Sequence, residues 1–356
     1  MLGAVIRFSL TQRLFILVLT AILVGFGVRA WFTLPIDAFP EISPTQVKII
    51  LKAPGMTPEE IERRVTYPIE TELLGIPRQS MLRSTTKYAI TDITLDFLDG
   101  TDIYWARQQV NERLAAVRDQ LPAIVTGGVA PMSTPLGEMF MFTLENPALS
   151  LMERRQLLDW AVRPVLRTVP GVADVTVLGG RVRTFHSTPE TNRLAQLGLG
   201  RGALRDALAA NHRNIGAGRI FQGNDVLVVR TEGRVAGLDE LRLVPVADAS
   251  GAVHRLGDLA DIGIGHLARS GAVTRDGEET AQGLVIALRG ANTGEVVEGI
   301  KARLAELERS LPPGSHFNVF YDRARLIETA VRTIAVALVL AVVLVIALLA
   351  LFLGNL

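Results

Sequence analysis

The stretch Leu14–Pro40 reads LFILVLTAILVGFGV from residue 14 to residue 28 and continues as RAWFTLPIDAFP. Residues 14–28 carry no charge, and apolar side chains continue almost without interruption to Pro35. About 20 apolar residues are what an α-helix needs to cross the hydrocarbon core of a bilayer. Pro35 cannot continue that helix. The stretch therefore predicts a membrane-spanning helix within residues 1–35 that leads directly into a folded extramembrane part.

A second apolar run lies at the other end of the sequence. It reads IAVALVLAVVLVIALLALF at Ile334–Phe352 and contains no charged residue. It predicts a second membrane helix within residues 331–356. Roughly 300 residues of ordinary globular composition separate the two runs, enough for more than one domain. Because the sequence ends directly after the second run, we expect the chain to be a fragment of a longer membrane protein.

Composition excludes several classes of function. The formal net charge is +1 and the pI is about 8.1, so no basic surface suggests a nucleic-acid partner. The sequence has no cysteine, which excludes disulfides and thiolate metal sites. Aromatic residues make up 6% of the chain, and it holds 32 glycines. These values suit a β-containing domain joined to aliphatic helices.

The charges beside the first run predict its orientation. Arg7 and Arg13 precede the run, whereas Asp37 and Glu41 follow it. Positive residues favour the cytoplasmic side, so we expect a cytoplasmic amino-terminus and a large domain on the outer side of the membrane. The alternative is a cleaved signal peptide, with the two arginines as its charged start. Against this alternative, Val28–Trp31 is a poor small-residue cleavage site.

The first part of the extramembrane region, assigned to residues 36–135, predicts a ferredoxin-like unit. Its order is strand, helix, strand, strand, helix, strand, which is the split βαβ pattern. Thr57 and Glu60 form a capping-box signature at the start of the first helix, and Pro68 should kink it. The expected strands are 47–53, 80–85, 90–97 and 125–129, and the expected helices are 57–74 and 103–120.

A weak internal repeat predicts a second βαββαβ unit, interrupted by an insertion. Residues 136–200 supply its first part, residues 201–270 the insertion and residues 271–330 its second part. Strands at 172–178 and 181–187 should pair with each other around Gly179 and Gly180. The other expected elements are strands at 138–144, 283–288 and 316–321 and helices at 151–169 and 293–311. The expected fold class is therefore α+β with two ferredoxin-like subdomains between two membrane-spanning helices.

Several phrases carry a family resemblance. They are LPIDAFPEIS from residue 34, PGMTPEEIE from 54, VTYPIE from 65, FLDGTDIYWARQQVNERL from 97, VPGVADVTVLGG from 169 and FYDRARLIETAV from 320. Together they resemble the amino-terminal third of a resistance–nodulation–division (RND) efflux pump of the heavy-metal cation subgroup, the cobalt–zinc–cadmium type. The resemblance runs from Met1 to Leu356.

The resemblance implies a function and partners. The two βαββαβ units would be porter subdomains, and the insertion would dock towards an outer-membrane channel. Such pumps are homotrimers of the bacterial inner membrane that work with a periplasmic adaptor protein and an outer-membrane channel, and the proton gradient drives export. Neither apolar run contains an Asp or Glu, although proton coupling through lipid needs an intramembrane carboxylate. This chain alone therefore cannot be the working antiporter.

Two carboxylates are candidates for contact with a transported metal ion. Glu138 begins the strand in PLGEMF, and Asp174 lies in VADV. In the pumps that this sequence resembles, acidic residues of these strands face the porter cleft. Divalent cations such as Zn²⁺ and Co²⁺ accept carboxylate ligands. The alternative is that both residues are ordinary solvated strand-end carboxylates, because charged residues are mostly exposed.

Other chemistry-bearing residues have simpler interpretations. Met139 and Met141 could offer thioethers to Cu(I) or Ag(I), but their period of two favours core packing. The five histidines are scattered and form no HExxH motif. Asp96, Asp99 and Asp102 lie at a strand–helix turn, where Asp caps helices. We expect no cofactor and no enzymatic activity, because no nucleophile–base constellation is present.

Three alternatives to a metal exporter remain open at this level. One is an RND pump for organic compounds. Another is a two-span sensor with a periplasmic binding domain, and the last is a protein-translocation accessory related to the same superfamily. The sequence downstream of Leu356 would discriminate them, since a pump needs further hydrophobic spans and a sensor needs a signalling domain.

Overall fold

The computed structural model describes residue 8 and residues 11–33, 43–133, 136–223, 225–231, 233–269 and 271–353. Three sequence predictions fall outside these residues. They are the orientation signals at Arg7, Asp37 and Glu41, the helix-ending role of Pro35, and the phrase LPIDAFPEIS up to Ile42.

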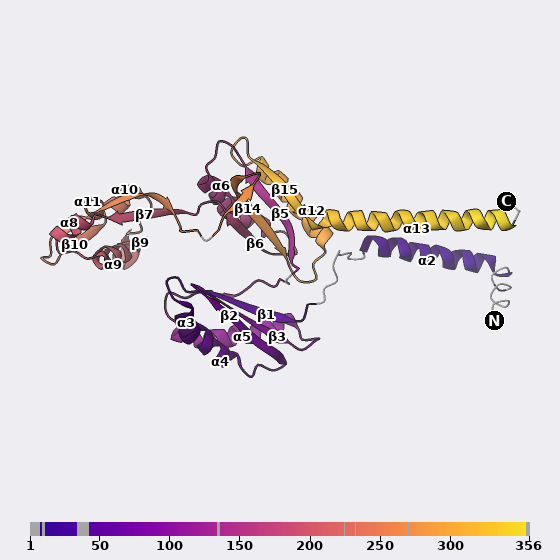
Figure 1. The fold of residues 1–356 in the computed structure, drawn as a ribbon, viewed down its shortest axis with the longest axis horizontal. Helices are drawn as coiled ribbons and strands as arrows, with labels where there is room; N and C mark the ends of the chain where they lie inside the picture. The colour runs from indigo at the N-terminus through magenta and orange to yellow at the C-terminus, as the bar shows by residue number, and fades with distance from the viewer. Residues whose placement is uncertain are drawn as a thin grey trace. The chain divides into compact units, whose positions relative to one another are not determined.

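A four-stranded antiparallel sheet forms the first βαββαβ unit (Figure 1). Its strands lie in the order β2-β3-β1-β4. Alternate residues of β1 and β3 and one stripe of each helix share a single apolar core, which includes Ile49, Leu51, Ile93, Leu95 and Val110. The elements are β1 (Gln46–Lys52), α3 (Pro58–Ile61), α4 (Tyr67–Leu73), β2 (Gln79–Lys87), β3 (Ile90–Phe97), α5 (Ile103–Val117) and β4 (Thr126–Val129).

Local capping sets the helix starts of this unit. The Thr57 hydroxyl accepts a hydrogen bond from the Glu60 amide at 3.3 Å, and the Glu60 carboxylate accepts one from the Thr57 amide at 2.9 Å. This is the predicted capping box. The Asp102 carboxylate accepts a hydrogen bond from the Trp105 amide at 2.7 Å and so caps α5.

The first helix of each unit contains a π-helical segment that the sequence did not predict. Glu62–Thr66 precedes Pro68, and Leu158–Val162 precedes Pro164. Proline lacks an amide hydrogen, and its ring clashes with the carbonyl four residues earlier in a regular helix. A wider turn removes that conflict. The predicted kink at Pro68 therefore takes the form of a π segment, which ends two residues before the proline in both units.

The second sheet repeats the strand order of the first. Its order is β13-β14-β5-β15, and β6 also pairs with β14. Without the short strand β13, the second sheet has the order β6-β14-β5-β15. Numbered by their order in the chain, the four strands of each sheet therefore lie as second, third, first and fourth. The elements are β5 (Glu138–Glu145), α6 (Leu151–Leu157), α7 (Arg163–Leu166), β6 (Val172–Gly179), β13 (Val273–Arg275), β14 (Glu278–Ala287), α12 (Thr293–Glu308) and β15 (His316–Asp322).

One predicted strand pair is wrong. Strand β7 (Arg183–Pro189) pairs with β12 (Ala260–His266) and not with β6. Gly179 and Gly180 both have left-handed backbones, with φ of 68° and 64°, but they do not close a hairpin. The Gly180 amide instead donates to the Thr280 carbonyl of β14 at 3.1 Å. Periodicity along the chain cannot distinguish a neighbouring partner strand from one that arrives much later in the sequence.

The elements between β7 and β12 form a separate small core. Its buried residues are Leu194, Leu204, Leu241, Val244, Val246, Leu256, Leu259, Ala260 and Ile262. This part starts at α8, before the predicted insertion at 201–270, and contains most of that insertion. The elements are α8 (Thr191–Gln196), α9 (Arg201–Asn211), β8 (Ile215–Gln222), β9 (Asp225–Thr231), α10 (Leu238–Arg242), β10 (Pro245–Ala247), β11 (Val253–Arg255) and α11 (Leu256–Leu259).

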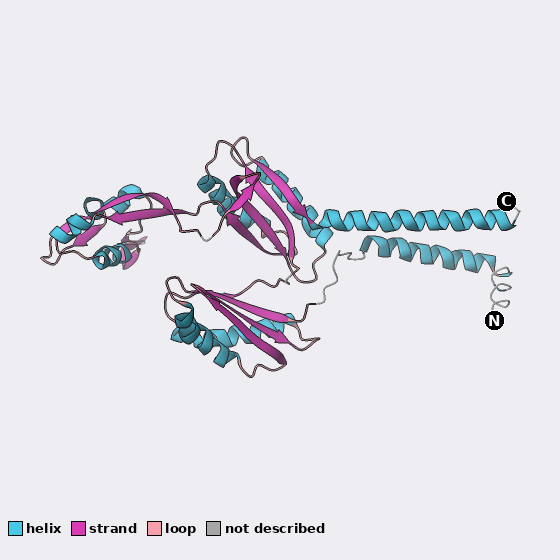
Figure 2. Cartoon of the chain, in the orientation of Figure 1, coloured by secondary structure: helices cyan, strands magenta, loops and turns pink. Residues whose placement is uncertain are grey.

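The two apolar runs differ in length as helices. Helix α13 (Arg323–Leu353) follows β15 without a loop, and its residues 323–352 are long and apolar enough to cross a membrane (Figure 2). Helix α2 (Arg13–Thr33) holds only a shorter apolar helix, Leu14–Gly27. Among the described residues, one helix rather than the predicted two therefore meets the length and composition of a span. Arg29 stands two residues after Gly27 and limits the uncharged part of α2.

The contacts within the chain divide it into two compact units, which differ from the two βαββαβ units described above. One contains residues 1–143, 162–176 and 283–356, and the other contains residues 144–161 and 177–282. Strands β5, β6 and β14 each carry residues of both units. The observed class is mixed α and β, as the sequence predicted.

Candidate functional site

The structure places the two predicted metal-contacting carboxylates on different strands. Glu138 is the first residue of β5, and it is exposed. Asp174 is the third residue of β6 and is half-buried. Strand β14 lies between β5 and β6 in the sheet, so the two residues are not cross-strand neighbours.

Asp174 is already neutralised by basic neighbours. Arg163 Nη2 and Arg167 Nε each lie 3.3 Å from its carboxylate oxygens. The Val175 amide donates to Asp174 Oδ1 at 2.8 Å. A metal cation would have to displace two guanidinium groups before it could bind there. Within the part of the chain that the structure describes, no group of three or more His, Asp or Glu side chains is placed to hold a metal ion.

A cavity of about 420 Å³ lies beside the first sheet. Strands β1, β2 and β3 supply most of its wall, and polar side chains predominate. The lining residues are Gln46, Lys48, Arg83, Ser84, Thr85, Asp92, Thr94, Arg107, Ala130, Pro131 and Ser133. We refer to this feature as the sheet cavity.

The alternation of β3 explains why charged groups gather at the sheet cavity. Ile93 and Leu95 point into the apolar core, so Asp92, Thr94 and Asp96 share the opposite face of the strand. These three side chains form a polar stripe in which two carboxylates flank one hydroxyl. The Thr94 hydroxyl donates to Asp92 Oδ1 at 3.3 Å.

Each carboxylate of the stripe has a basic partner on a neighbouring strand. Lys48 Nζ of β1 lies 2.8 Å from Asp92 Oδ2. Arg83 Nη1 of β2 lies 3.1 Å from Asp96 Oδ2. The Asp96 side chain is only 10% exposed, whereas that of Asp92 is 32% exposed. Asp92 is therefore the carboxylate of the stripe that solvent and solutes reach more readily.

Arg107 extends from α5 to the rim of the sheet cavity. Its Nη1 donates to the Ala130 carbonyl at 2.6 Å. Burial lowers the pKa of the Arg107 guanidinium below its ordinary value. The group stays cationic at neutral pH, since arginine titrates far above that range. Arg107 thus joins Lys48 and Arg83 as a third basic side chain that lines the sheet cavity.

The stripe can hold cations at separate positions along β3. Carboxylate and hydroxyl oxygens are ligands for hard and borderline divalent cations. Asp92 and Asp96 are four residues apart, about 13 Å along an extended strand, so they cannot share one ion. At either position a cation would have to compete with the lysine or arginine that is already paired with the carboxylate. This arrangement suits weak, transient binding better than a closed metal centre.

Sequence reasoning missed the residues of the sheet cavity. It treated Asp96 as a helix cap, but Asp96 pairs with Arg83, and only Asp102 caps α5. The one signal in the sequence was the polar period of two at 92, 94 and 96.

The methionines and several of the histidines considered as metal ligands are engaged in core packing or in hydrogen bonds. Met139 is fully buried and Met141 half-buried, in line with core packing. His254 Nε2 lies 3.0 Å from Asp248 Oδ2, and His186 Nε2 lies 3.2 Å from the His266 carbonyl oxygen. These methionines and histidines therefore add nothing to the sheet cavity.

Residues 5–356 match the profile of the AcrB/AcrD/AcrF family. The chain is 38% identical over 364 residues to the cation efflux system protein CzcA of Alcaligenes sp. (strain CT14). It is 33% identical to the nickel and cobalt resistance protein CnrA of Cupriavidus metallidurans and to the cation efflux system protein CusA of Escherichia coli K12. These alignments cover 100%, 100% and 94% of this chain and 34%, 36% and 32% of the relatives.

The fold also matches solved structures. The crystal structure of a heavy metal efflux pump superposes with a TM-score of 0.88 at 29% sequence identity. That match covers 99% of this chain and 35% of the pump, so the chain spans about a third of the length of the proteins it matches. The comparisons confirm the resemblance to RND pumps of the heavy-metal subgroup, and the chain belongs to the AcrB/AcrD/AcrF family.

Proposed function

We propose that this chain is the amino-terminal part of the inner-membrane component of a proton-driven tripartite efflux pump that exports divalent heavy-metal cations. The match to the family over residues 5–356 is the observation that carries this proposal. The names of the relatives, which include cobalt–zinc–cadmium and nickel–cobalt resistance proteins, support metal cations as cargo. Transport itself would require the remaining two thirds of the pump subunit.

The domain assignment follows the duplicated strand order. We assign 1–35 and 331–356 to membrane helices, 36–135 to a first porter subdomain, and 136–200 with 271–330 to a second porter subdomain. Residues 201–270 are assigned to a docking insertion that faces an outer-membrane channel. The repeated order of strands in both sheets and the separate core between β7 and β12 support this division.

The exposed carboxylates would guide the cation. Glu138 is exposed, and no ion pair to it occurs among the described residues, so it is the better of the two predicted metal contacts. Asp174 would take part only after Arg163 and Arg167 release it. Asp92, beside the sheet cavity, would offer a further transient position. Several weak positions suit a passage, because a cargo that binds must also leave.

The proposal includes partners and location. The complete protein would form a homotrimer in the bacterial inner membrane, with its large domain in the periplasm. It would bind a periplasmic adaptor protein and an outer-membrane channel, and it would contact no nucleic acid. It would need no bound cofactor and catalyse no reaction, the metal ion being cargo. The carboxylates for proton coupling would lie in other membrane helices, since residues 334–352 include none.

A resistance assay tests the proposal. The complete gene is expressed in a bacterial strain without its own metal exporters, and the minimal inhibitory concentrations of Zn²⁺, Co²⁺, Cd²⁺ and Ni²⁺ are measured with those of cationic dyes. We expect higher tolerance of at least one divalent metal and no change for dyes. Higher tolerance of dyes alone would instead identify a pump for organic compounds.

A further inference from the structure

The exit from the second sheet towards β7 depends on two consecutive glycines. An added Cβ at Gly179 would lie 2.5 Å from the Thr280 carbonyl oxygen, and one at Gly180 would lie 2.8 Å from Arg155 Cβ. Both backbones are left-handed, which glycine adopts without strain. Only Arg181 and Val182 then separate Gly180 from β7. We refer to residues 179–182, which lead from the end of β6 to β7, as the exit crossing. It is a short linker without a core of its own.

Arg155 of α6 holds the exit crossing. Its Nη1 donates to the Gly179 carbonyl at 2.7 Å, and its Nε lies 2.7 Å from Asp159 Oδ2 one turn further along the helix. The Arg155 side chain is 17% exposed and the Asp159 side chain 21% exposed. Charge-assisted bonds of this length in a half-buried place are the stronger kind. Asp159 orients the guanidinium, and the guanidinium fixes the carbonyl at the point where the chain leaves β6.

The return crossing runs from the end of β12 through the three-residue strand β13 to the turn before β14, and a second set of charges holds it. Arg269 Nη1 lies 2.9 Å from Glu279 Oε2 of β14, and this hydrogen bond lowers the pKa of the Glu279 carboxyl. Arg275, the last residue of β13, lies 3.2 Å from Glu145 Oε1. Asp276 and Gly277 have positive φ values of 51° and 87°, and they join β13 to β14 in a two-residue turn.

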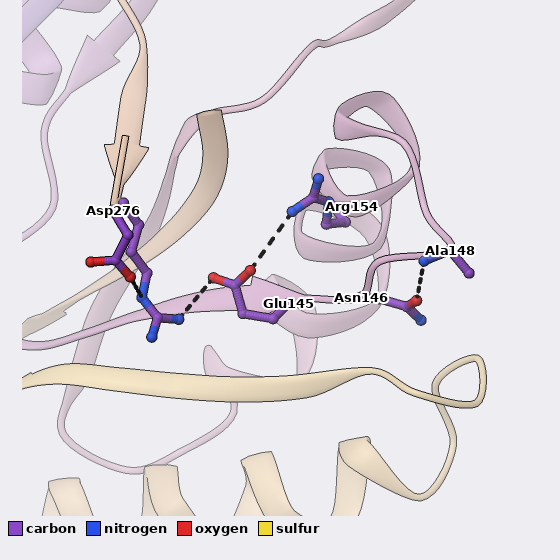
Figure 3. A network of polar contacts seen from close by, with 6 residues as sticks. Glu145, Asn146, Ala148, Arg154 and Asp276 are labelled. Atoms are coloured by element: carbon purple, nitrogen blue, oxygen red, sulfur yellow. Dashed lines mark hydrogen bonds and ion pairs between the residues drawn. The ribbon is translucent and has the colours of Figure 1, made fainter. Parts of the chain in front are cut away.

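Glu145 connects the return crossing to the same helix (Figure 3). Arg154 Nη1 lies 3.8 Å from Glu145 Oε2, so this carboxylate stands between Arg154 and Arg275. Figure 3 shows Arg154 extending from its helix towards Glu145, with the Asp276 turn on the other side of the carboxylate. Adjacent residues of α6 thus serve the two crossings. Arg155 contacts the exit directly, and Arg154 contacts the return through Glu145.

We propose that Arg154 and Arg155 form a double clamp that holds both polypeptide crossings at the base of the part between β7 and β12. These polar contacts lie outside the buried core of that part, whose described residues run only from 194 to 262. A change at α6 is then transmitted to both crossings at once. The clamp depends on geometry within one compact unit and is independent of the cargo of the pump.

Trypsin tests the clamp, because Arg181 lies in the exit crossing and Arg269 in the return crossing. The full chain in detergent is treated with limiting trypsin, and cleavage after each arginine is followed by mass spectrometry. Arg155→Met removes the bond to Gly179 and keeps an apolar stem. Losing a charge-assisted bond of this kind should raise the initial rate of cleavage after Arg181 by about tenfold. Glu145→Gln should raise cleavage after Arg269 by about threefold.

A matched control separates the clamp from general loosening of the fold. Arg303→Met removes the exposed Arg303–Glu306 pair on α12 and should leave both rates unchanged. Hydrogen exchange of Arg155→Met and Glu145→Gln should rise at residues 179–183 and 267–275 and stay unchanged in the core at 194–262. Exchange of the control Arg303→Met should match that of the original chain at these residues. Unchanged trypsin rates in Arg155→Met would overturn the clamp, and so would exchange that rises evenly through the whole unit. Arg155→Lys, which keeps the charge but not the two-pronged contact, should restore only part of the protection.

Discussion

The Lys48 ammonium lies 2.8 Å from Asp92, although Lys48 stands directly opposite Thr94 in the register of β1 and β3. The ion pair is therefore diagonal, and both of its side chains line the sheet cavity. A long, flexible lysine in such a position is easily displaced, since its side chain is 48% exposed and strongly hydrated. The pair keeps Asp92 neutralised in the absence of a cation and leaves it accessible to an arriving one.

Removing that lysine should strengthen cation binding. In Lys48→Met the Asp92 carboxylate loses its counterion, and the affinity of the chain for Zn²⁺ or Co²⁺ should rise by about threefold to fivefold, the range of a partly exposed ion pair. Isothermal titration of the full chain in detergent measures it. Arg303→Met frees a carboxylate outside the cavity and serves as the control. Equal gains in both variants would show that any freed carboxylate acts in the same way.

Glu138 and Asp174 should differ in their effect on metal binding. Glu138→Gln removes an exposed carboxylate, so we expect a clear loss of Zn²⁺ and Co²⁺ affinity. Asp174→Asn should change affinity little, because Arg163 and Arg167 already occupy that carboxylate. It should instead reduce stability by about 1–3 kcal/mol, because two cationic groups lose their partner. Unchanged affinity in both variants, measured by the same titration, would remove the two residues from the proposed site.

Gly180→Ala should destabilise the chain more than Gly198→Ala. Both glycines have left-handed backbones, with φ of 64° and 63°, so alanine costs about 1 kcal/mol at either position. The new methyl at 180 would also meet Arg155 Cβ, whereas no atom lies within 4 Å at 198. Overpacking of this kind adds about 1–3 kcal/mol. Urea unfolding followed by tryptophan fluorescence checks the difference, and equal losses would contradict the packing at the exit crossing.

Acid should loosen the turn between β10 and β11. Hydrogen bonds from the Ser250 hydroxyl and from His254 hold the pKa of Asp248 well below its ordinary value of 3.8. A depressed pKa stabilises the folded turn above pH 3.8, and this contribution is lost as pH falls from there through the folded-state pKa. Hydrogen exchange of the Ser250 and Ala252 amides, which donate to Asp248, should therefore accelerate relative to the rest of the chain in that range.

Asp248→Asn tests the source of this pH dependence. The variant should show fast exchange at those two amides already at neutral pH, with a flatter profile below pH 3.8. Asp239→Asn, at a carboxylate that is 94% exposed, is the control and should keep the wild-type profile. A pH profile that survives in Asp248→Asn would place the titrating group elsewhere.

Local signals in the sequence were sufficient for many elements of the fold. The capping box at Thr57 and the cap at Asp102 each depend on residues within one turn, and the structure contains both. The π segments were missed because two different distortions, a kink or a wider turn, both accommodate a proline. The pairing of β7 with β12 was missed because hydrophobic alternation is the same whichever strand lies alongside.

For the candidate site, the sequence pointed to carboxylates but not to their surroundings. Asp174 looked accessible, yet α7 and the residue after it bring Arg163 and Arg167 to it. Asp96 looked like a helix cap and Asp92 was not singled out, yet β1 and β2 supply counterions to both carboxylates, and Asp92 lines a cavity. Ion pairs join residues that are distant along the chain, so spacing in the sequence does not report them.

By itself, the sequence determined which segments are apolar enough to cross or approach a membrane, where helices begin, and that the extramembrane part repeats one order of elements. Those properties depend on neighbouring residues and on composition. The tertiary structure alone decided which strands pair, which carboxylates are neutralised, and how α6 holds the two crossings at Gly179 and Arg275. Such relationships depend on side chains from separate strands and helices meeting in space, and only the folded chain brings them within hydrogen-bond distance.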